Sequence, residues 1–86
     1  MANVMITIRV MPSDSNVDIE KLVDQIKEKT GAEKIEKEPI AFGLVALKVT
    51  TLLEDKEGEV EKLENTLKSI EGIGEIETIN ISRTYI

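Results

Sequence analysis

Apolar and polar residues alternate along residues 4–11, which is the period-two pattern of a strand with one buried face. The apolar positions of this strand are Val4, Ile6, Ile8 and Val10. Pro12 follows them, and proline has no N–H with which to bond a neighbouring strand. We therefore expect the first strand to end at Pro12.

The apolar residues next adopt the spacing of one helix face, at positions i, i+3, i+4 and i+7. These positions are Ile19, Leu22, Val23 and Ile26. Asp18 precedes them and is a good N-cap residue, while Gly31 suits the left-handed position that ends many helices. The pattern predicts a helix between Asp18 and Gly31.

Two strands of different character follow in the middle of the chain. Residues 33–38 are polar and at best form an edge strand, where charged side chains discourage unwanted pairing. Residues 44–53 are the most apolar run of the chain and predict a central strand with helices over one face.

The last third of the chain predicts a helix and a final strand. Residues 56–71 carry apolar residues at helical spacing, with Glu57 and Glu59 in the first turn and Gly72 beyond the end. Ile79 and Ile81 then alternate with polar residues. Ile76 has the opposite parity, which indicates either a β-bulge or an earlier start of this strand.

The predicted order is βαββαβ, the split-βαβ or ferredoxin-like arrangement of the α+β class. Right-handed crossovers place the first and third strands at the centre of a four-stranded antiparallel sheet, with two helices on one face. The other face stays open, and we expect it to carry Thr7, Arg9, Lys48 and Thr50. Residues 1–86 form a single domain in this prediction.

Composition narrows the function classes. A chain of 86 residues has one small core, which leaves little room for a deep active site. It contains no Cys and no His, so thiolate and imidazole chemistry are excluded. A net charge of -6 disfavours nucleic acid as a partner. With no apolar run of membrane-spanning length and no basic leader, we expect a soluble, cytoplasmic protein that does not contact a membrane.

Candidate motifs for chemistry are weak. The pairs Glu36 with Glu38 and Glu75 with Glu77 are expected to be solvated surface side chains, so neither pair is a candidate for general acid–base catalysis. Residues 54–57 lack the spacing of a calcium loop, and residues 72–74 lack the third glycine and following helix of a phosphate loop. We expect no catalytic residue, no metal and no cofactor.

Phe42 lies in the segment between the two middle strands, next to Gly43 and shortly after Pro39. A lone Phe is most often a core residue. However, a constrained loop that presents an aromatic ring lowers the cost of ordering it in a partner's pocket. The residues alone leave both interpretations open.

Residues 38–49, Glu-Pro-Ile-Ala-Phe-Gly-Leu-Val-Ala-Leu-Lys-Val, resemble the central motif of archaeal translation elongation factor 1-beta. The segments 5–12 and 70–77 are similar to the family's first strand and to the passage into its last strand. The resemblance implies a guanine-nucleotide exchange domain over residues 1–86 that replaces GDP by GTP on the GTPase elongation factor 1-alpha, regenerating the form that carries aminoacyl-tRNA. It implies no enzyme chemistry and requires no homo-oligomer.

The resemblance also suggests which residues meet the partner. Phe42 falls on an aromatic that contacts the GTPase in eukaryotic relatives. Those relatives end in a lysine-bearing tail, whereas residues 83–86 here contain no lysine, so only Arg83 is available in its place. The candidate partner-binding residues are Pro39, Ile40, Ala41, Phe42, Gly43, Lys48, Arg83 and Tyr85. The alternative is a small-molecule-sensing or regulatory βαββαβ module that oligomerises through its sheet edge.

Overall fold

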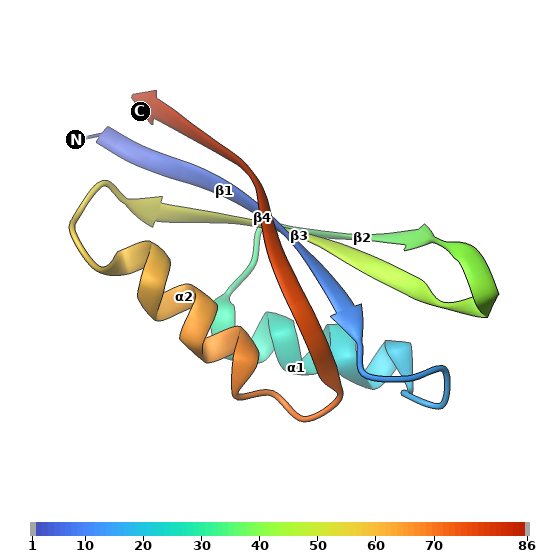
Figure 1. Ribbon diagram of the computed structural model, residues 1–86. Helices are drawn as coiled ribbons and strands as arrows, with labels where there is room; N and C mark the ends of the chain where they lie inside the picture. Colours follow the sequence, from blue (N-terminus) through green and yellow to red (C-terminus); the bar gives the residue numbers. More distant parts are fainter. Residues whose placement is uncertain (1, 86) are drawn as a thin grey trace.

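The computed structural model of the protein describes the backbone of residues 2–85 and the side chains of residues 3–41 and 43–83. The elements are β1 (Ala2–Pro12), α1 (Ile19–Thr30), β2 (Lys34–Pro39), the 3-10 turn η1 (Ala41–Gly43), β3 (Val45–Glu54), α2 (Glu59–Lys68) and β4 (Ile73–Tyr85). The strands form one antiparallel sheet in the order β2-β3-β1-β4. Both helices lie on the same side of this sheet (Figure 1). The predicted ferredoxin-like α+β architecture is confirmed.

The core lies between the helices and the two central strands. The predicted apolar face of β1 is confirmed, since all four of its residues are buried. Leu47 and Val49 of β3 join it from the neighbouring strand. The helices contribute Leu22, Ile26, Leu63 and Leu67.

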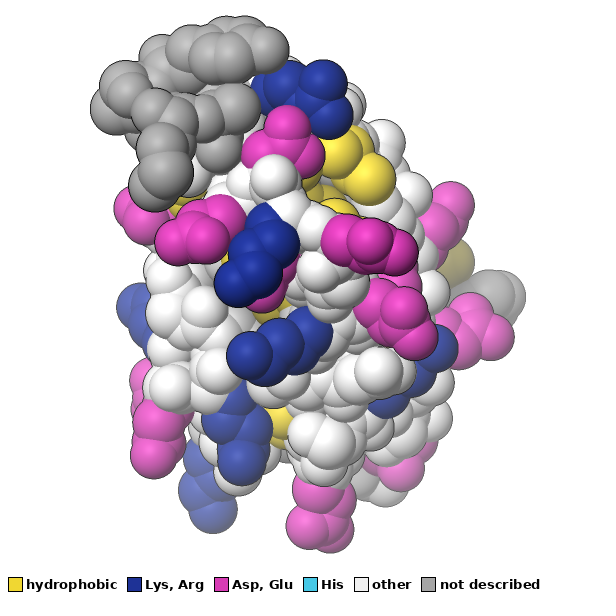
Figure 2. Space-filling model, turned by 90° about the vertical axis from the view of Figure 1, so that its left-hand side faces the viewer, with side chains coloured by type: hydrophobic (Ala, Val, Ile, Leu, Met, Phe, Trp, Pro, Cys, Tyr) yellow, Lys and Arg dark blue, Asp and Glu magenta, His cyan; other side chains and the backbone are white. Residues whose placement is uncertain are grey.

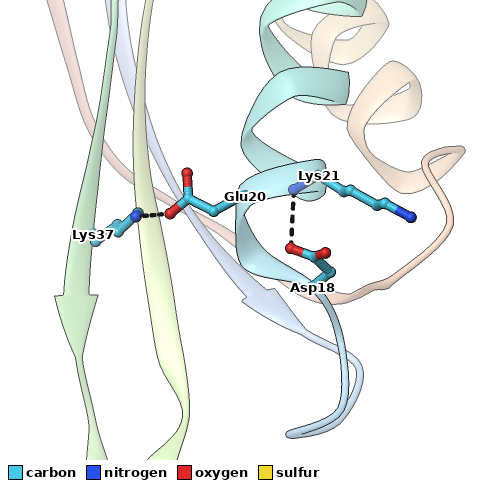
Figure 3. A network of polar contacts seen from close by, with 4 residues as sticks. All are labelled: Asp18, Glu20, Lys21 and Lys37. Atoms are coloured by element: carbon cyan, nitrogen blue, oxygen red, sulfur yellow. Dashed lines mark hydrogen bonds and ion pairs between the residues drawn. The ribbon is translucent and has the colours of Figure 1, made fainter.

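Helix α1 begins and ends as its sequence predicts. The Asp18 side chain accepts a hydrogen bond from the backbone N–H of Lys21 at 3.3 Å (Figure 3). At the other end Gly31 has φ 64°, and its N–H donates to the carbonyl of Lys27 at 2.9 Å. Figure 3 also shows Glu20 of α1 reaching Lys37 of β2 as an ion pair, which connects the first helix to the edge strand.

Helix α2 is shorter than the predicted 56–71. It begins after Gly58, whose φ of 88° is left-handed and interrupts the helix on its N-terminal side. It ends at Ser69, and the N–H of Ile70 donates to Leu67 in a tighter turn. Glu57 thus precedes the helix, and the acidic residues of the first turn are Glu59 and Glu61.

Strand β4 contains the irregularity that Ile76 indicates, and it also starts early, at Ile73. Thr7 pairs with Asn80 and Ile8 with Thr78, so Ile79 is the extra residue of a β-bulge. The bulge changes which residues face the core. Ile76 packs against the core. Beyond the bulge Ile81 pairs with Ile6 and so lies on the helix side, but it is 55% exposed, and Ile79 is 37% exposed.

Candidate functional site

The connection between β2 and β3 is a tight loop with a defined backbone. The N–H of Ile40 donates to the carbonyl of Leu44 at 2.9 Å, and the N–H of Leu44 donates to Ala41 at 3.4 Å. Gly43 has φ 73°, a conformation that residues with a side chain rarely adopt. Apart from its two chain neighbours, no described residue lies within 4 Å of a Cβ built on Gly43, so backbone conformation and not crowding favours glycine there.

Several predicted partner-binding residues of this loop are accessible. Pro39, Ala41 and Gly43 are exposed, and Ile40 is half-buried. Phe42 is the middle residue of η1, but its side chain lies outside the described part of the structure. The loop forms one end of the molecule, opposite the two termini (Figure 1). It therefore offers a short, constrained protrusion for a protein contact.

The face of the sheet without helices carries a row of charges across all four strands. Strand register places Glu36, Lys48, Arg9 and Glu77 side by side in the order β2-β3-β1-β4. The two cations are central and the two carboxylates lie at the edges. Arg9 forms ion pairs, whereas none is found for Lys48 among the residues with described side chains. Lys48 is thus the cation of this row without an ion pair among the described side chains.

The next row of this open face is polar but uncharged at its centre. Thr7 and Thr50 are paired in register, and their hydroxyl oxygens are 3.4 Å apart. One row further, Met5 pairs with Leu52, and Met5 is 38% exposed. The predicted positions of Thr7, Arg9, Lys48 and Thr50 on one open face agree with this register.

Arg83 lies elsewhere. It pairs in register with Val4, a core residue, so it belongs to the helix side of the sheet. Its guanidinium is bound to Asp55 in the β3–α2 loop, with Nε 2.8 Å from Oδ2 and Nη2 3.4 Å from Oδ1. The backbone of Tyr85 pairs with Ala2, and its side chain lies outside the described residues.

The structure therefore separates the predicted site residues into two ends and a middle. The loop that contains Phe42 precedes β3, and Asp55, the partner of Arg83, follows it. At about 3.3 Å per residue, β3 separates the two ends by roughly 30 Å. Lys48 lies between them. A partner that contacts both ends must extend along the molecule, whose longest dimension is 41 Å.

The end at which the termini lie carries charges of both signs. Figure 2 views the molecule from that end and shows Lys and Arg side chains interspersed with Asp and Glu. No group of three or more acidic side chains that could hold a metal ion occurs in the part of the chain that the structure describes. Neither described helix is long and apolar enough to cross a membrane.

Comparison with known proteins shows the family of the chain. Residues 5–84 match the model of the EF-1 guanine nucleotide exchange domain, and the chain belongs to that family. It is similar to the elongation factor 1-beta of Thermoplasma acidophilum, with 37% identity covering 95% of this chain and 98% of that protein. The same protein of Methanothermobacter thermautotrophicus is 45% identical, and that of Aeropyrum pernix 46% identical, each covering 96% of this chain and 98% of the relative. The predicted resemblance of this chain to archaeal elongation factor 1-beta is confirmed.

The sequence did not indicate two contacts of the surface. Arg9 has carboxylate partners on both edge strands, and Asp55 holds Arg83. The parity of β1 places Arg9 on the open face, but no local pattern states how far its side chain reaches. The pairing of Asp55 with Arg83 joins residues 28 apart in the chain and has no sequence signal.

Proposed function

We propose that residues 1–86 act as a single exchange domain that releases GDP from elongation factor 1-alpha, so that GTP replaces it. The observation that supports this most directly is the family match, which runs from residue 5 to residue 84. A protein with this role acts during translation elongation, and the proposed place of action is the cytoplasm.

The proposed contact surface consists of the β2–β3 loop and the open face of the sheet. The loop contributes Pro39, Ile40, Ala41, Phe42 and Gly43, and the open face contributes Lys48. The accessibility of Pro39, Ala41 and Gly43 supports a contact through the loop. Both described helices lie on the opposite side of the sheet, which supports a contact through the open face. Arg83 and Tyr85 provide a second contact, at the other end, for a partner that extends along β3.

The proposed mechanism needs no covalent step. An exchange factor binds the nucleotide-free GTPase more tightly than the loaded one, and by reciprocity the factor and the nucleotide weaken each other's binding. Accelerating release about 1,000-fold corresponds to lowering the dissociation barrier by about 4 kcal/mol. A few well-packed contacts can supply that amount. The net charge of -6 favours encounter with a basic surface.

The test is release of a fluorescent GDP analogue from elongation factor 1-alpha in a stopped-flow instrument, with and without this chain. We expect acceleration at substoichiometric amounts of the chain, because an exchange factor is released after each cycle. An unchanged release rate at saturating concentration would refute the proposal and favour the regulatory alternative.

A further inference from the structure

Arg9 connects the two edge strands of the sheet from its place on the central strand β1. Its Nε lies 3.8 Å from Oε2 of Glu38 on β2, and its Nη1 lies 3.9 Å from Oε2 of Glu77 on β4. The guanidinium has several N–H groups in a planar fork, which lets one side chain face two carboxylates. Arg9 thus spans all four strands on the open face.

The contact with Glu38 runs diagonally across β3. Arg9 is in register with Lys48, whereas Glu38 is in register with Ala46, two residues closer to the β2–β3 loop. Leu47 faces the helices, so its neighbour Ala46 faces the open side of the sheet. Ala46 is nevertheless 0% exposed. Side chains on the open face must therefore cover Ala46, and its small methyl group leaves room for the side chain of Arg9.

The two facing atoms of this contact are shielded from solvent. Arg9 Nε and Glu38 Oε2 are both buried, and neither has a hydrogen-bond partner among the described residues. Because water screens such atoms little, their attraction is stronger than that of an exposed pair at the same distance. The contact with Glu77 differs, since the Glu77 side chain is 70% exposed.

The end of β2 has a backbone partner on one side only. β2 is an edge strand paired on one side with β3, and its last pair is Pro39 with Val45. Beyond Pro39, which has no N–H to donate, the bond from the N–H of Ile40 to the carbonyl of Leu44 closes the loop, and a side-chain contact at Glu38 adds to this bond. Glu38 also lies only three residues before η1 begins.

We propose that Arg9 is a positioning residue: through Glu38 it holds the end of β2 and thereby sets the placement of the loop Ala41–Gly43 toward the GTPase. This inference rests on the proposed exchange function. Arg9 itself does not need to touch the partner. Without the contact, the loop is less ordered before binding, and each encounter must first order it.

The first experiment measures the loop without any GTPase. Hydrogen exchange of the Ile40 amide reports the bond to Leu44 that closes the loop. We expect Arg9→Met and Glu38→Gln each to speed this exchange by about five-fold, the factor for losing a modest ion pair. Glu77→Gln is the matched control, because it removes the other carboxylate of Arg9 and leaves β2 untouched.

The second experiment measures nucleotide release with the same three variants. The KM for elongation factor 1-alpha should rise about five-fold for Arg9→Met and Glu38→Gln, with kcat unchanged, since the loop still reaches its bound position. The double variant should be no worse than either single variant, because both remove the same contact. Arg9→Lys should restore part of the loss, since an ammonium can face Glu38 but not both carboxylates.

Two results would overturn the proposal. One is an unchanged Ile40 amide in both Arg9→Met and Glu38→Gln. The other is a Glu77→Gln variant that matches Glu38→Gln in both assays, which would show a general effect on the sheet. If the wild-type chain releases no GDP, the exchange function fails, but the amide measurement still decides whether Arg9 orders the loop.

Discussion

The two faces of the sheet differ although the same strands build them. On β1, Ile6, Ile8 and Val10 face the helices and are 0% exposed, whereas Thr7 and Arg9 between them face away and are half-buried. On β1 the covered face is apolar, whereas the open face carries the hydroxyl group of Thr7 and the guanidinium of Arg9. Alternate residues of one strand therefore differ in role: one set stabilises the core, and the other is available for contact with a partner.

The two faces differ in how much free energy of unfolding is lost when a side chain is substituted. Removing buried methyl groups leaves a cavity in a close-packed core. Exposed ion pairs contribute only about 0–1 kcal/mol. Substitutions on the open face can therefore alter binding while the fold is retained.

The largest effect is expected on the covered face. Ile8→Ala should lower the free energy of unfolding by about 2–5 kcal/mol, because Ile8 is fully enclosed in the core. Urea denaturation measures this. Thr7→Val, at the adjacent position on the open face, is the control and should change stability by less than about 1 kcal/mol. Equal losses in the two variants would contradict the division between the faces.

Phe42 should show the largest effect on exchange. If its ring meets the partner, Phe42→Ala should reduce the rate of GDP release about ten-fold or more, equivalent to about 1.4 kcal/mol, and change folding stability by less than about 1 kcal/mol. Stopped-flow GDP release and urea denaturation of the same variant decide between a partner-facing and a core position of Phe42. A stability loss of about 3–5 kcal/mol, with the remaining folded protein fully active, would place Phe42 in the core instead.

Lys48 should have an intermediate effect, confined to binding. Since Lys48 forms no ion pair within the described side chains, Lys48→Glu should slow exchange about three-fold at low salt, with the difference shrinking as salt is added. Lys34→Glu, also on the open face but at its edge, serves as the control. A salt-independent loss would argue against a charge contact.

The smallest effect is expected for Arg83. Because Arg83 is exposed and already bound to Asp55, Arg83→Ala should lower stability by less than about 1 kcal/mol and slow GDP release by about two-fold or less. Asp55→Asn is the companion variant and should behave alike. A large loss of exchange in Arg83→Ala alone would contradict the minor weight expected of this second contact with the partner.

Much of the fold could be predicted because its signals are local. The alternation along 4–11, the N-cap at Asp18 and the turn at Gly31 depend on residues within a few positions of one another. The ends of α2 could not be predicted in the same way. The apolar stripe continues to Ile70, which is 3% exposed but lies in the turn after the helix, so burial and helix length do not coincide.

The sequence predicted the individual segments of the candidate site but not how they are arranged in space. The loop around Phe42 and the parity of Lys48 follow from short segments of sequence. That the loop and Arg83 lie at opposite ends of β3 follows only from strand order and direction. Only the family resemblance connects the candidate partner-binding residues in the sequence, and in the structure the sheet separates them.

The amino-acid sequence by itself determined the order of elements, the covered face of β1 and the caps of α1, because period and capping are properties of neighbouring residues. Tertiary structure alone decided that the bulge at Ile79 places Ile81 opposite Ile6, on the helix side, and that Arg9 reaches across β3 to Glu38. These features depend on which residue lies opposite or diagonal on another strand. That neighbour is chosen by register, which no short stretch of sequence contains.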